Sequence, residues 1–173
     1  MRTIIVEPYN PVWPEEFEKI KAYIWPHISC ICLDIIHVGS TSVPGLAAKP
    51  IIDIDIIIES YDVFPQLVKL LNSLGYEHDG DGGIPSRERF KYDSSNFNKH
   101  HLYACPKSSP ELERHILFRD YLRQHDAVRD EYAALKQQLA QKYKHDIDAY
   151  IEGKSKLILK TIAGAKLTKE VTK

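Results

Sequence analysis

The stretch "IIHVGSTSVPGLAAKPIIDIDIII", from Ile35 to Ile58, decides the fold. It contains two apolar segments of strand length, separated by a loop that opens with Gly39 and Ser40. The second segment carries Asp53 and Asp55, and carboxylates in such an apolar run are costly unless a partner compensates them. The stretch therefore predicts two strands joined across a turn, with a pair of acids that needs a compensating group.

The remaining sequence predicts an α+β fold, in which a mixed sheet flanked by helices is followed by a C-terminal helical bundle. Strands are expected over residues 29–38, 51–58, 87–92 and 100–105. From Pro110 onward the patterns are helical only, with breaks near His125 and Lys144. We expect a single domain over residues 1–173, made of an α/β core (1–107) and a helical part (108–167).

Composition and charge argue against several classes of protein. A net charge of −1 gives no global support for binding nucleic acid or membranes. No apolar run approaches the roughly 20 residues needed to cross a bilayer, and the first residues lack the apolar core of a secretion signal. The cysteines, Cys30, Cys32 and Cys105, are odd in number, and the first two are expected in a strand. We therefore expect a cytoplasmic protein, while its oligomeric state is not indicated.

The two acids have the spacing of a metal site. Asp53 and Asp55 alternate with isoleucines, so on a strand they lie on one face, about 7 Å apart. Mg²⁺ or Mn²⁺ suits such a pair, because Mg²⁺ binds through one or two carboxylates and keeps waters and substrate phosphates. Two such metals would support in-line phosphoryl or nucleotidyl transfer. The alternative is a pair of exposed acids that bind lysine or arginine and only support the fold.

The turn provides the features of a phosphate site. Glycine at position 39 lets the backbone approach an anion closely. Hydroxyls and amides for phosphate oxygens, at the start of a short helix, are offered by Ser40, Thr41 and Ser42. His37 and Lys49, which flank the turn, are further candidates for phosphate contact. A structural histidine and a solvated loop lysine remain the alternatives for these two.

The run "HVGSTSVPGLAAKPIIDIDI" resembles the signature of the GrpB family, small proteins placed in the nucleotidyltransferase-like, polymerase-β-type superfamily. The segments "PYNPVWPEEFEKI", "HHLYAC", "FRDYLRQHD" and "YIEGKSKLI" extend the resemblance over nearly the whole chain. It implies a nucleotidyltransferase-like sheet, with the superfamily's pattern positions at Gly39, Ser40, Asp53 and Asp55. Fold alone does not establish an activity.

The resemblance also implies a third carboxylate on a later strand, where this chain has none. The expected strand "KHHLYAC" carries His100 and His101, which point to opposite faces, and we favour His101 as the residue facing the acids. Imidazole is a good ligand for Zn²⁺ and a poor one for Mg²⁺. His101 is thus a candidate metal ligand together with Asp53 and Asp55, or a group that acts on the substrate as acid, base or phosphate donor.

Basic residues are candidates for the other wall of a substrate cleft. Among several such residues, including Arg87, we favour four: Arg89, Arg119, Lys136 and Lys154. The two lysines lie in the family-like segments "YAALK" and "YIEGKSK". Solvated helix faces and intrahelical ion pairs are the alternative for all of them.

Three functions follow from these expectations. The first is a metal-dependent nucleotidyltransferase that uses a nucleoside triphosphate and an unknown small-molecule acceptor. The second is a module that binds a nucleotide or phosphorylated cofactor without turnover, which the missing third acid permits. The third is a metal phosphoesterase that uses His101 with the acids.

Overall fold

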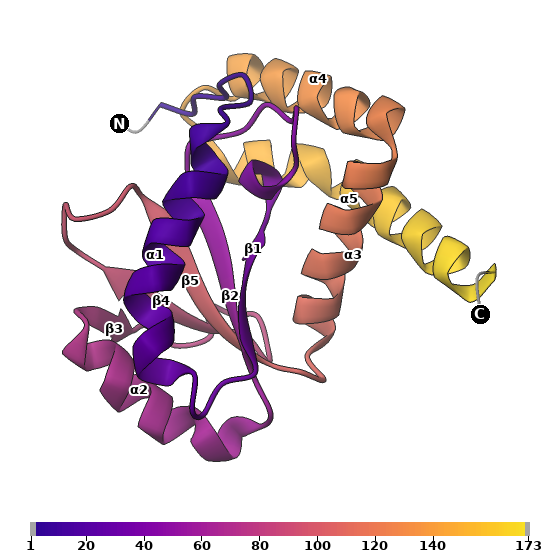
Figure 1. The fold of residues 1–173 in the computed structure, drawn as a ribbon. Helices are drawn as coiled ribbons and strands as arrows, with labels where there is room; N and C mark the ends of the chain where they lie inside the picture. Colours follow the sequence, from indigo (N-terminus) through magenta and orange to yellow (C-terminus); the bar gives the residue numbers. More distant parts are fainter. Residues whose placement is uncertain (1–2, 172–173) are drawn as a thin grey trace.

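The structure, a computed structural model, describes the backbone of residues 3–171 and the side chains of residues 3–168. Ten main elements follow one another along the described chain (Figure 1): α1 (Val12–Ile28), β1 (Asp34–Val38), β2 (Ile52–Ile58), α2 (Phe64–Ser73), β3 (Tyr76–His78), β4 (Glu88–Tyr92), β5 (His100–Pro106), α3 (Pro110–Gln124), α4 (Asp126–Lys142) and α5 (Ile147–Val171). Single 3₁₀ turns form at Ser40–Ser42 and Tyr61–Val63. The predicted α+β class is confirmed.

The five strands form one mixed sheet in the order β1-β2-β5-β4-β3. Strands β2 and β5 run parallel, and the other neighbouring pairs are antiparallel. The register places Asp53 beside His101 and Asp55 beside Tyr103. Two segments 48 residues apart in sequence therefore bring their polar side chains to one face.

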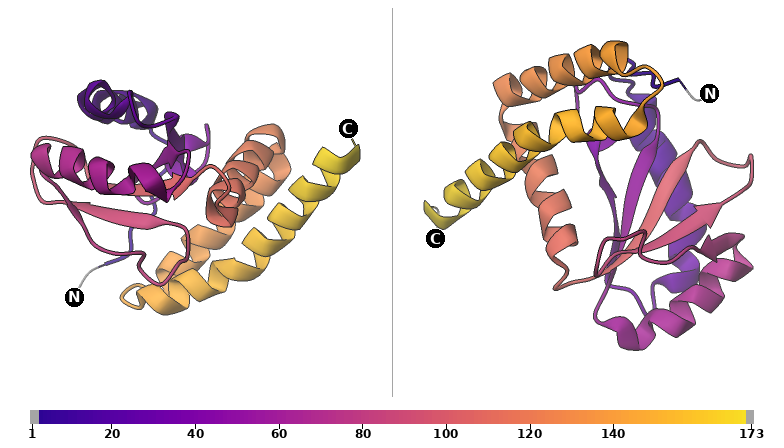
Figure 2. Two further views of the ribbon diagram at one scale, coloured as in Figure 1. Left: turned by 90° about the horizontal axis from the view of Figure 1, so that it is seen from below. Right: turned by 180° about the vertical axis from the view of Figure 1, so that it is seen from behind.

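Helices α1 and α2 cover one face of the sheet, while α3, α4 and α5 lie on the other side (Figure 2). Strand β2 alternates its side chains, and Ile52, Ile54, Ile56 and Ile58 join the main core beneath α1 and α2. The intervening acids consequently face the side of α3. A functional site that uses the two acids therefore lies on the side of the sheet that faces α3.

The C-terminal helices hold the loop between β1 and β2. Ser109 caps α3 by accepting a hydrogen bond from the amide of Leu112, and Pro110 occupies the first turn, as expected at a helix start. A second core cluster joins Val43 and Leu46 of the loop to Leu122 of α3 and Tyr132 of α4. The turn is thus packed against the helical part.

The first strand starts later than the sequence predicts. The amides of Ser29 and Cys32 donate to carbonyls of the last turn of α1, which keeps this segment in a turn until Asp34. Cys30 is exposed and Cys32 is buried, so the two thiols do not share a strand face. Within the described residues, no helix combines the length and the apolar character that crossing a membrane requires.

Candidate functional site

The two acids of β2 lie in different environments. The Asp53 side chain is 31% exposed, whereas that of Asp55 is completely buried. They share a face of the sheet, as the alternation predicts, but only Asp53 is accessible to a large ligand. The pair therefore cannot be treated as two equivalent ligands.

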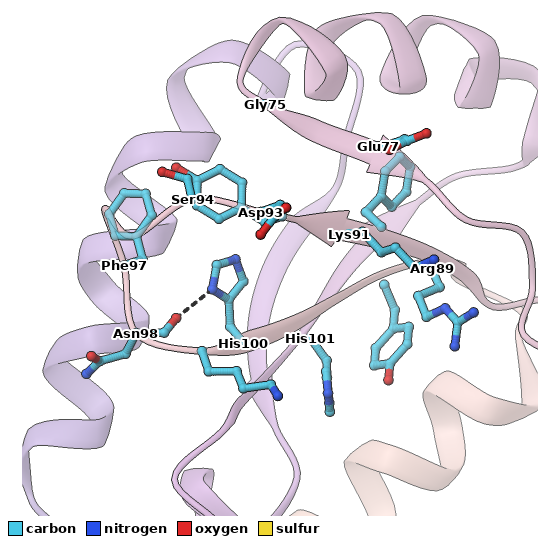
Figure 3. A pocket seen from close by; sticks show the side chains of 14 residues that line it. Gly75, Glu77, Arg89, Lys91, Asp93, Ser94, Phe97, Asn98, His100 and His101 are labelled. Atoms are coloured by element: carbon cyan, nitrogen blue, oxygen red, sulfur yellow. Dashed lines mark hydrogen bonds between the residues drawn. The ribbon is translucent and has the colours of Figure 1, made fainter. Parts of the chain in front are cut away.

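Asp53 is hydrogen-bonded to a histidine of the neighbouring strand. Nδ1 of His101 lies 2.8 Å from Oδ1 of Asp53. A carboxylate only accepts, so Nδ1 carries the proton and a neutral ring keeps its lone pair on Nε2. His100 leaves β5 in the opposite direction (Figure 3), where its ring nitrogens bond to the carbonyl of Asn98 and the hydroxyl of Tyr76. The structure thus brings His101, and not His100, to the acids.

Asp55 is compensated by a histidine of α3. Nδ1 of His115 donates to Oδ2 of Asp55 at 2.7 Å, and Nε2 of the same ring lies 3.2 Å from Oε1 of Glu111. Both nitrogens face carboxylates, so this ring is an imidazolium. Burial opposes its charge, but the two hydrogen-bonded acids raise the pKa of His115 to about 9. Burial raises the pKa of Asp55, while His115 opposes that shift.

His115 and Glu111 were not among the site residues predicted from the sequence. Two features of the sequence could have indicated them. Glu111 and His115 are spaced at i and i+4 at the start of an expected helix, and the acids of the apolar strand needed a cation. Nothing local connects that helix to β2, since 60 residues separate His115 from Asp55. Only the tertiary fold identifies this partner.

Gly39 permits a close approach to Asp53. Its φ of +70° is in the left-handed region, and an added Cβ would lie 2.3 Å from Oδ2 of Asp53. The expected helix start after it is only the single 3₁₀ turn, and the Ser42 hydroxyl donates back to the Gly39 carbonyl at 2.6 Å. The turn is therefore shaped by contact with the acid and by its own hydrogen bonds, without an α-helix behind it.

His37 and Thr41 are bonded to the protein. The Thr41 hydroxyl donates to the carbonyl of Ile51 and lies 2.9 Å from Nε2 of His37, whose ring stacks on Phe17. Burial, followed by the charges of Arg123 and Arg119, lowers the pKa of His37 to about 4, although Asp53 opposes this shift. The structural alternative accounts for the contacts of His37 and Thr41, and their contact with phosphate stays a prediction.

Three arginines of the helical part bind backbone carbonyls around the turn. Arg119 donates to the carbonyl of His37 at 3.0 Å, and Arg123 donates twice to that of Ser42. Arg129 reaches the carbonyl of Pro44. These contacts hold the turn in place. A substrate contact by Arg119, which the sequence favoured, stays a prediction beside this structural role.

Lysines converge near the turn from three segments. Lys136 of α4 is almost completely buried, and its Nζ has no hydrogen-bond partner within the described part of the chain. Burial and then the charge of Lys154 lower the pKa of Lys136 to about 7, opposed by Asp53. Burial and then the charge of Lys49 lower the pKa of Lys154 to about 8. These three lysines, which we call the lysine cluster, therefore lie within electrostatic reach of one another and of Asp53.

Tyrosines line the lysine cluster. Nζ of Lys136 lies 4.6 Å from the ring centre of Tyr132. Nζ of Lys154 and Nζ of Lys49 lie 4.5 Å and 5.6 Å from the ring centre of Tyr150. Tyr132 also interacts with the side chain of Ser40. Helix α4 consequently connects the turn to the lysine cluster through two residues one helical turn apart.

A cavity of about 650 Å³ opens beside His101, at the ends of β4 and β5 (Figure 3). Its lining includes Arg89, Lys91 and Tyr103. The register of β4 and β5 stops at the pair of Phe90 and Leu102, and the strands separate beyond it. The predicted residue Arg89 is thus brought to the cavity, with Tyr103 between it and the acids.

The donor set for a metal is two carboxylates. The buried Oδ1 of Asp55 has no partner among the described residues, and Oδ2 of Asp53 faces the turn. This fits Mg²⁺ or Mn²⁺, which needs few protein ligands beside a phosphorylated substrate. Over residues 3–168, whose side chains the structure describes, no three His, Cys, Asp or Glu residues are placed to hold a metal together. His101 turns its Nδ1 to Asp53, and its role as a third metal ligand beside Asp53 and Asp55 stays a prediction.

Comparison with known proteins places these features in a family. The GrpB protein family model matches residues 3–163. The UPF0157 protein YqkA of Bacillus subtilis is 38% identical over 173 aligned residues, which are 98% of this chain and 49% of that protein. This chain therefore spans about half the length of that relative.

Solved structures show the same fold. GrpB from Enterococcus faecalis is 36% identical with a TM-score of 0.83, over 93% of this chain and 96% of that one. Cid1 poly(U) polymerase with MgGTP bound gives a TM-score of 0.53 at 14% identity, over 79% of this chain and 44% of that one, a likeness of fold alone. The fold is nucleotidyltransferase-like, and the chain belongs to the GrpB family.

Proposed function

We propose that this protein is a metal-dependent nucleotidyltransferase, which transfers a nucleotidyl group from a nucleoside triphosphate to a small-molecule hydroxyl. The observation that carries the proposal is the meeting of Asp53, the turn at Gly39 and the lysine cluster in one place. Carboxylates for a metal and cations for phosphates are the two complementary parts that this reaction requires.

The lysine cluster binds the triphosphate in this proposal. Lys136 is the main group, because it is a buried ammonium with no hydrogen-bond partner in the described part of the chain, and such a group gains strongly from an anion. Lys154 and Lys49 add charge, and the side chain of Ser40 holds the phosphates from the side of the turn. A bound Mg²⁺ or Mn²⁺, held by Asp53 and Asp55, would neutralise phosphate charge and polarise the α-phosphate.

His101 takes the place of the third carboxylate as the proton acceptor. Its Nδ1 donates to Asp53, which orients the ring and leaves Nε2 for the acceptor hydroxyl. The hydroxyl oxygen bonds to the α-phosphorus, and the bond from that phosphorus to the bridging oxygen breaks. Pyrophosphate leaves with the electron pair, and the hydroxyl proton passes to Nε2. The resulting imidazolium is stabilised by Asp53.

Nucleotide transfer from an α-³²P-labelled nucleoside triphosphate to pooled small-molecule alcohols tests the proposal. His101→Ala is expected to lower the transfer rate at least 100-fold with little change in stability. His27→Ala, at an exposed histidine of α1 that does not line the cavity, is the matched control and is expected to keep the transfer rate. Equal transfer rates in both variants would contradict the role of His101.

Binding without turnover is the second candidate, and the state of Asp55 favours it. This acid is completely buried and already paired with His115, so it is less available to a second metal than an exposed acid. A protein of this kind binds a nucleoside triphosphate or phosphorylated cofactor through the lysine cluster and releases no pyrophosphate with any divalent metal. The labelled transfer assay separates the two candidates.

A further inference from the structure

Two arginines of β4 and the preceding loop lie together beside Tyr103. A Cβ added at Gly82 would lie 3.4 Å from Nη1 of Arg89 and 3.8 Å from Nη2 of Arg87, so both guanidinium groups border the same point. Arg87 also lies over the ring of Tyr103, at 4.3 Å from its centre. Two like charges are thus held close together on the face that carries the acids.

Both arginines keep an unused donor. Nε of Arg87 and Nε of Arg89 are buried and have no hydrogen-bond partner among the described residues. A buried donor without an acceptor is costly, and a guanidinium fork matches the oxygens of a phosphate or carboxylate. Two such donors at one place indicate an anionic ligand.

The acids nearby do not neutralise this pair fully. Asp79 forms ion pairs with both Arg89, at 2.5 Å from Nη2, and Lys91, at 2.6 Å from Nζ, so one carboxylate neutralises part of two cationic charges. The acids that act on Arg87 are Asp55 and Glu111, and both are already bound to the imidazolium of His115. Positive charge remains for a ligand.

The loop that presents the arginines is fixed by the backbone. Ser86, directly before Arg87, has a φ of +62°, a conformation that non-glycine residues rarely adopt. The amide of Arg89 donates to the carbonyl of Gly80, which ties the loop back to β4. Strained positions of this kind gather at functional sites. The loop therefore aims Arg87 at a defined place.

Tyr103 links the arginine pair to the proposed reaction centre. Its ring lies 6.2 Å from that of His101, and Arg89, Tyr103 and His101 all line the cavity of about 650 Å³. This volume is that of a small-molecule site. Arg89 and His101 are both among the side chains that line this cavity (Figure 3), so one small molecule in it can contact both.

We propose that this cavity is the acceptor site, and that the acceptor is a small anionic alcohol whose phosphate or carboxylate is bound by Arg87 and Arg89. This inference rests on the proposed nucleotidyl transfer, because the far end of the molecule presents its hydroxyl to His101. The two anion sites have separate tasks: the lysine cluster binds the donor triphosphate and the arginine pair binds the acceptor.

Arginine side-chain ¹H–¹⁵N spectra test the site directly. Inorganic phosphate is titrated into the protein, with Arg87→Lys and Arg89→Lys used to assign the Nε signals. Both signals are expected to shift with one half-saturation concentration. The Nε atoms of Arg119 and Arg123 already donate to Asp120 and Ser42, so their signals serve as internal controls that stay in place.

The same titration on Lys136→Met/Lys154→Met separates this inference from the proposed function. Shifts that persist in the double variant support an independent arginine site, whether or not nucleotides bind. Shifts that are absent in the wild type, or lost in the double variant, overturn it.

Ribose 5-phosphate, an anionic alcohol, is expected to shift the ring signals of His101 as well, whereas inorganic phosphate leaves them in place. An unmoved His101 with ribose 5-phosphate overturns the assignment as acceptor site.

Discussion

The buried carboxylate of Asp55 accepts a hydrogen bond of 2.7 Å from Nδ1 of His115, across a separation of 60 residues. This contact joins the central strand β2 to α3, and the same imidazolium ring also contacts Glu111. A charged pair with one buried partner is expensive to break, because the remaining charge has no water to solvate it. The contact therefore connects the α/β core to the helical part.

His115→Gln is expected to lower the free energy of unfolding by about 3 kcal/mol at pH 6, since it leaves the Asp55 carboxylate without its cation. Urea denaturation followed by circular dichroism measures the change. His27→Gln, at an exposed histidine of α1, is the control and is expected to change stability by less than about 0.5 kcal/mol. Equal effects of the two substitutions would contradict the role given to His115.

The stabilisation from His115 depends on pH in a defined direction. Its pKa is about 9 in the folded protein, above the ordinary value of 6.5, so the contribution is complete below pH 6.5 and is lost as pH rises through 9. The lowered pKa values of Lys136 and Lys154 give the opposite slope above pH 7. The difference between the wild type and His115→Gln isolates the histidine and is expected to shrink between pH 6.5 and 9.5. A difference that stays constant would show that His115 keeps its charge state.

Comparing Gly39→Ala with Gly80→Ala distinguishes the backbone strain of a left-handed residue from a steric clash with Asp53. Gly39 and Gly80 share a φ of +70°, but an added Cβ meets Asp53 only at Gly39 and meets nothing within 4 Å at Gly80. Gly80→Ala is expected to cost about 1 kcal/mol, the penalty of the left-handed conformation. Gly39→Ala is expected to cost at least about 2 kcal/mol and to disturb the signals of His101 in NMR spectra. Similar costs at both positions would argue against the close packing of Gly39 on Asp53.

Lys136→Met is expected to raise the stability of the protein and to weaken its binding of a triphosphate. Removing a buried cation that has no hydrogen-bond partner among the described residues is expected to raise the free energy of unfolding by about 2 kcal/mol at pH 6. The same change is expected to weaken triphosphate binding at least tenfold. Lys142→Met, at an exposed lysine of the same helix that also lies over a tyrosine, is the matched control and leaves both quantities unchanged. Loss of stability in Lys136→Met would contradict the assignment of an unpaired charge.

Local patterns in the sequence predict the part of the site that lies on adjacent strands. Alternation of apolar and acidic residues places Asp53 and Asp55 on one face, and the same rule allows only one of His100 and His101 to face them, of which we favoured His101. The pairing of His115 with Asp55 depends on how α3 packs against the sheet, which no local pattern encodes. Arg119 and Arg123 show the same limit: a basic residue on a helix looks alike in sequence whether it binds a substrate or a backbone carbonyl.

Local patterns in the sequence also do not predict that Nε of Arg87 and Nε of Arg89 are buried and lack an acceptor among the described residues. Their meeting depends on the glycine-rich loop before β4, whose path places Gly82 against both side chains. Turn residues in a sequence predict a loop, but they do not predict where that loop lies in the fold. For this reason the sequence alone assigned no acceptor site.

The most direct test of the account is calorimetric titration of a non-hydrolysable nucleoside triphosphate, with and without Mn²⁺, into the wild type, Asp53→Asn and Lys136→Met. Asp148→Asn, at an exposed acid of α5, is the control for the loss of a carboxylate. We expect metal-dependent binding in the wild type and the control, loss of the metal dependence in Asp53→Asn, and affinity at least tenfold lower in Lys136→Met. Equal affinities in all four proteins, or binding that is indifferent to the metal in the wild type, would contradict a triphosphate and metal site between Asp53 and the lysine cluster.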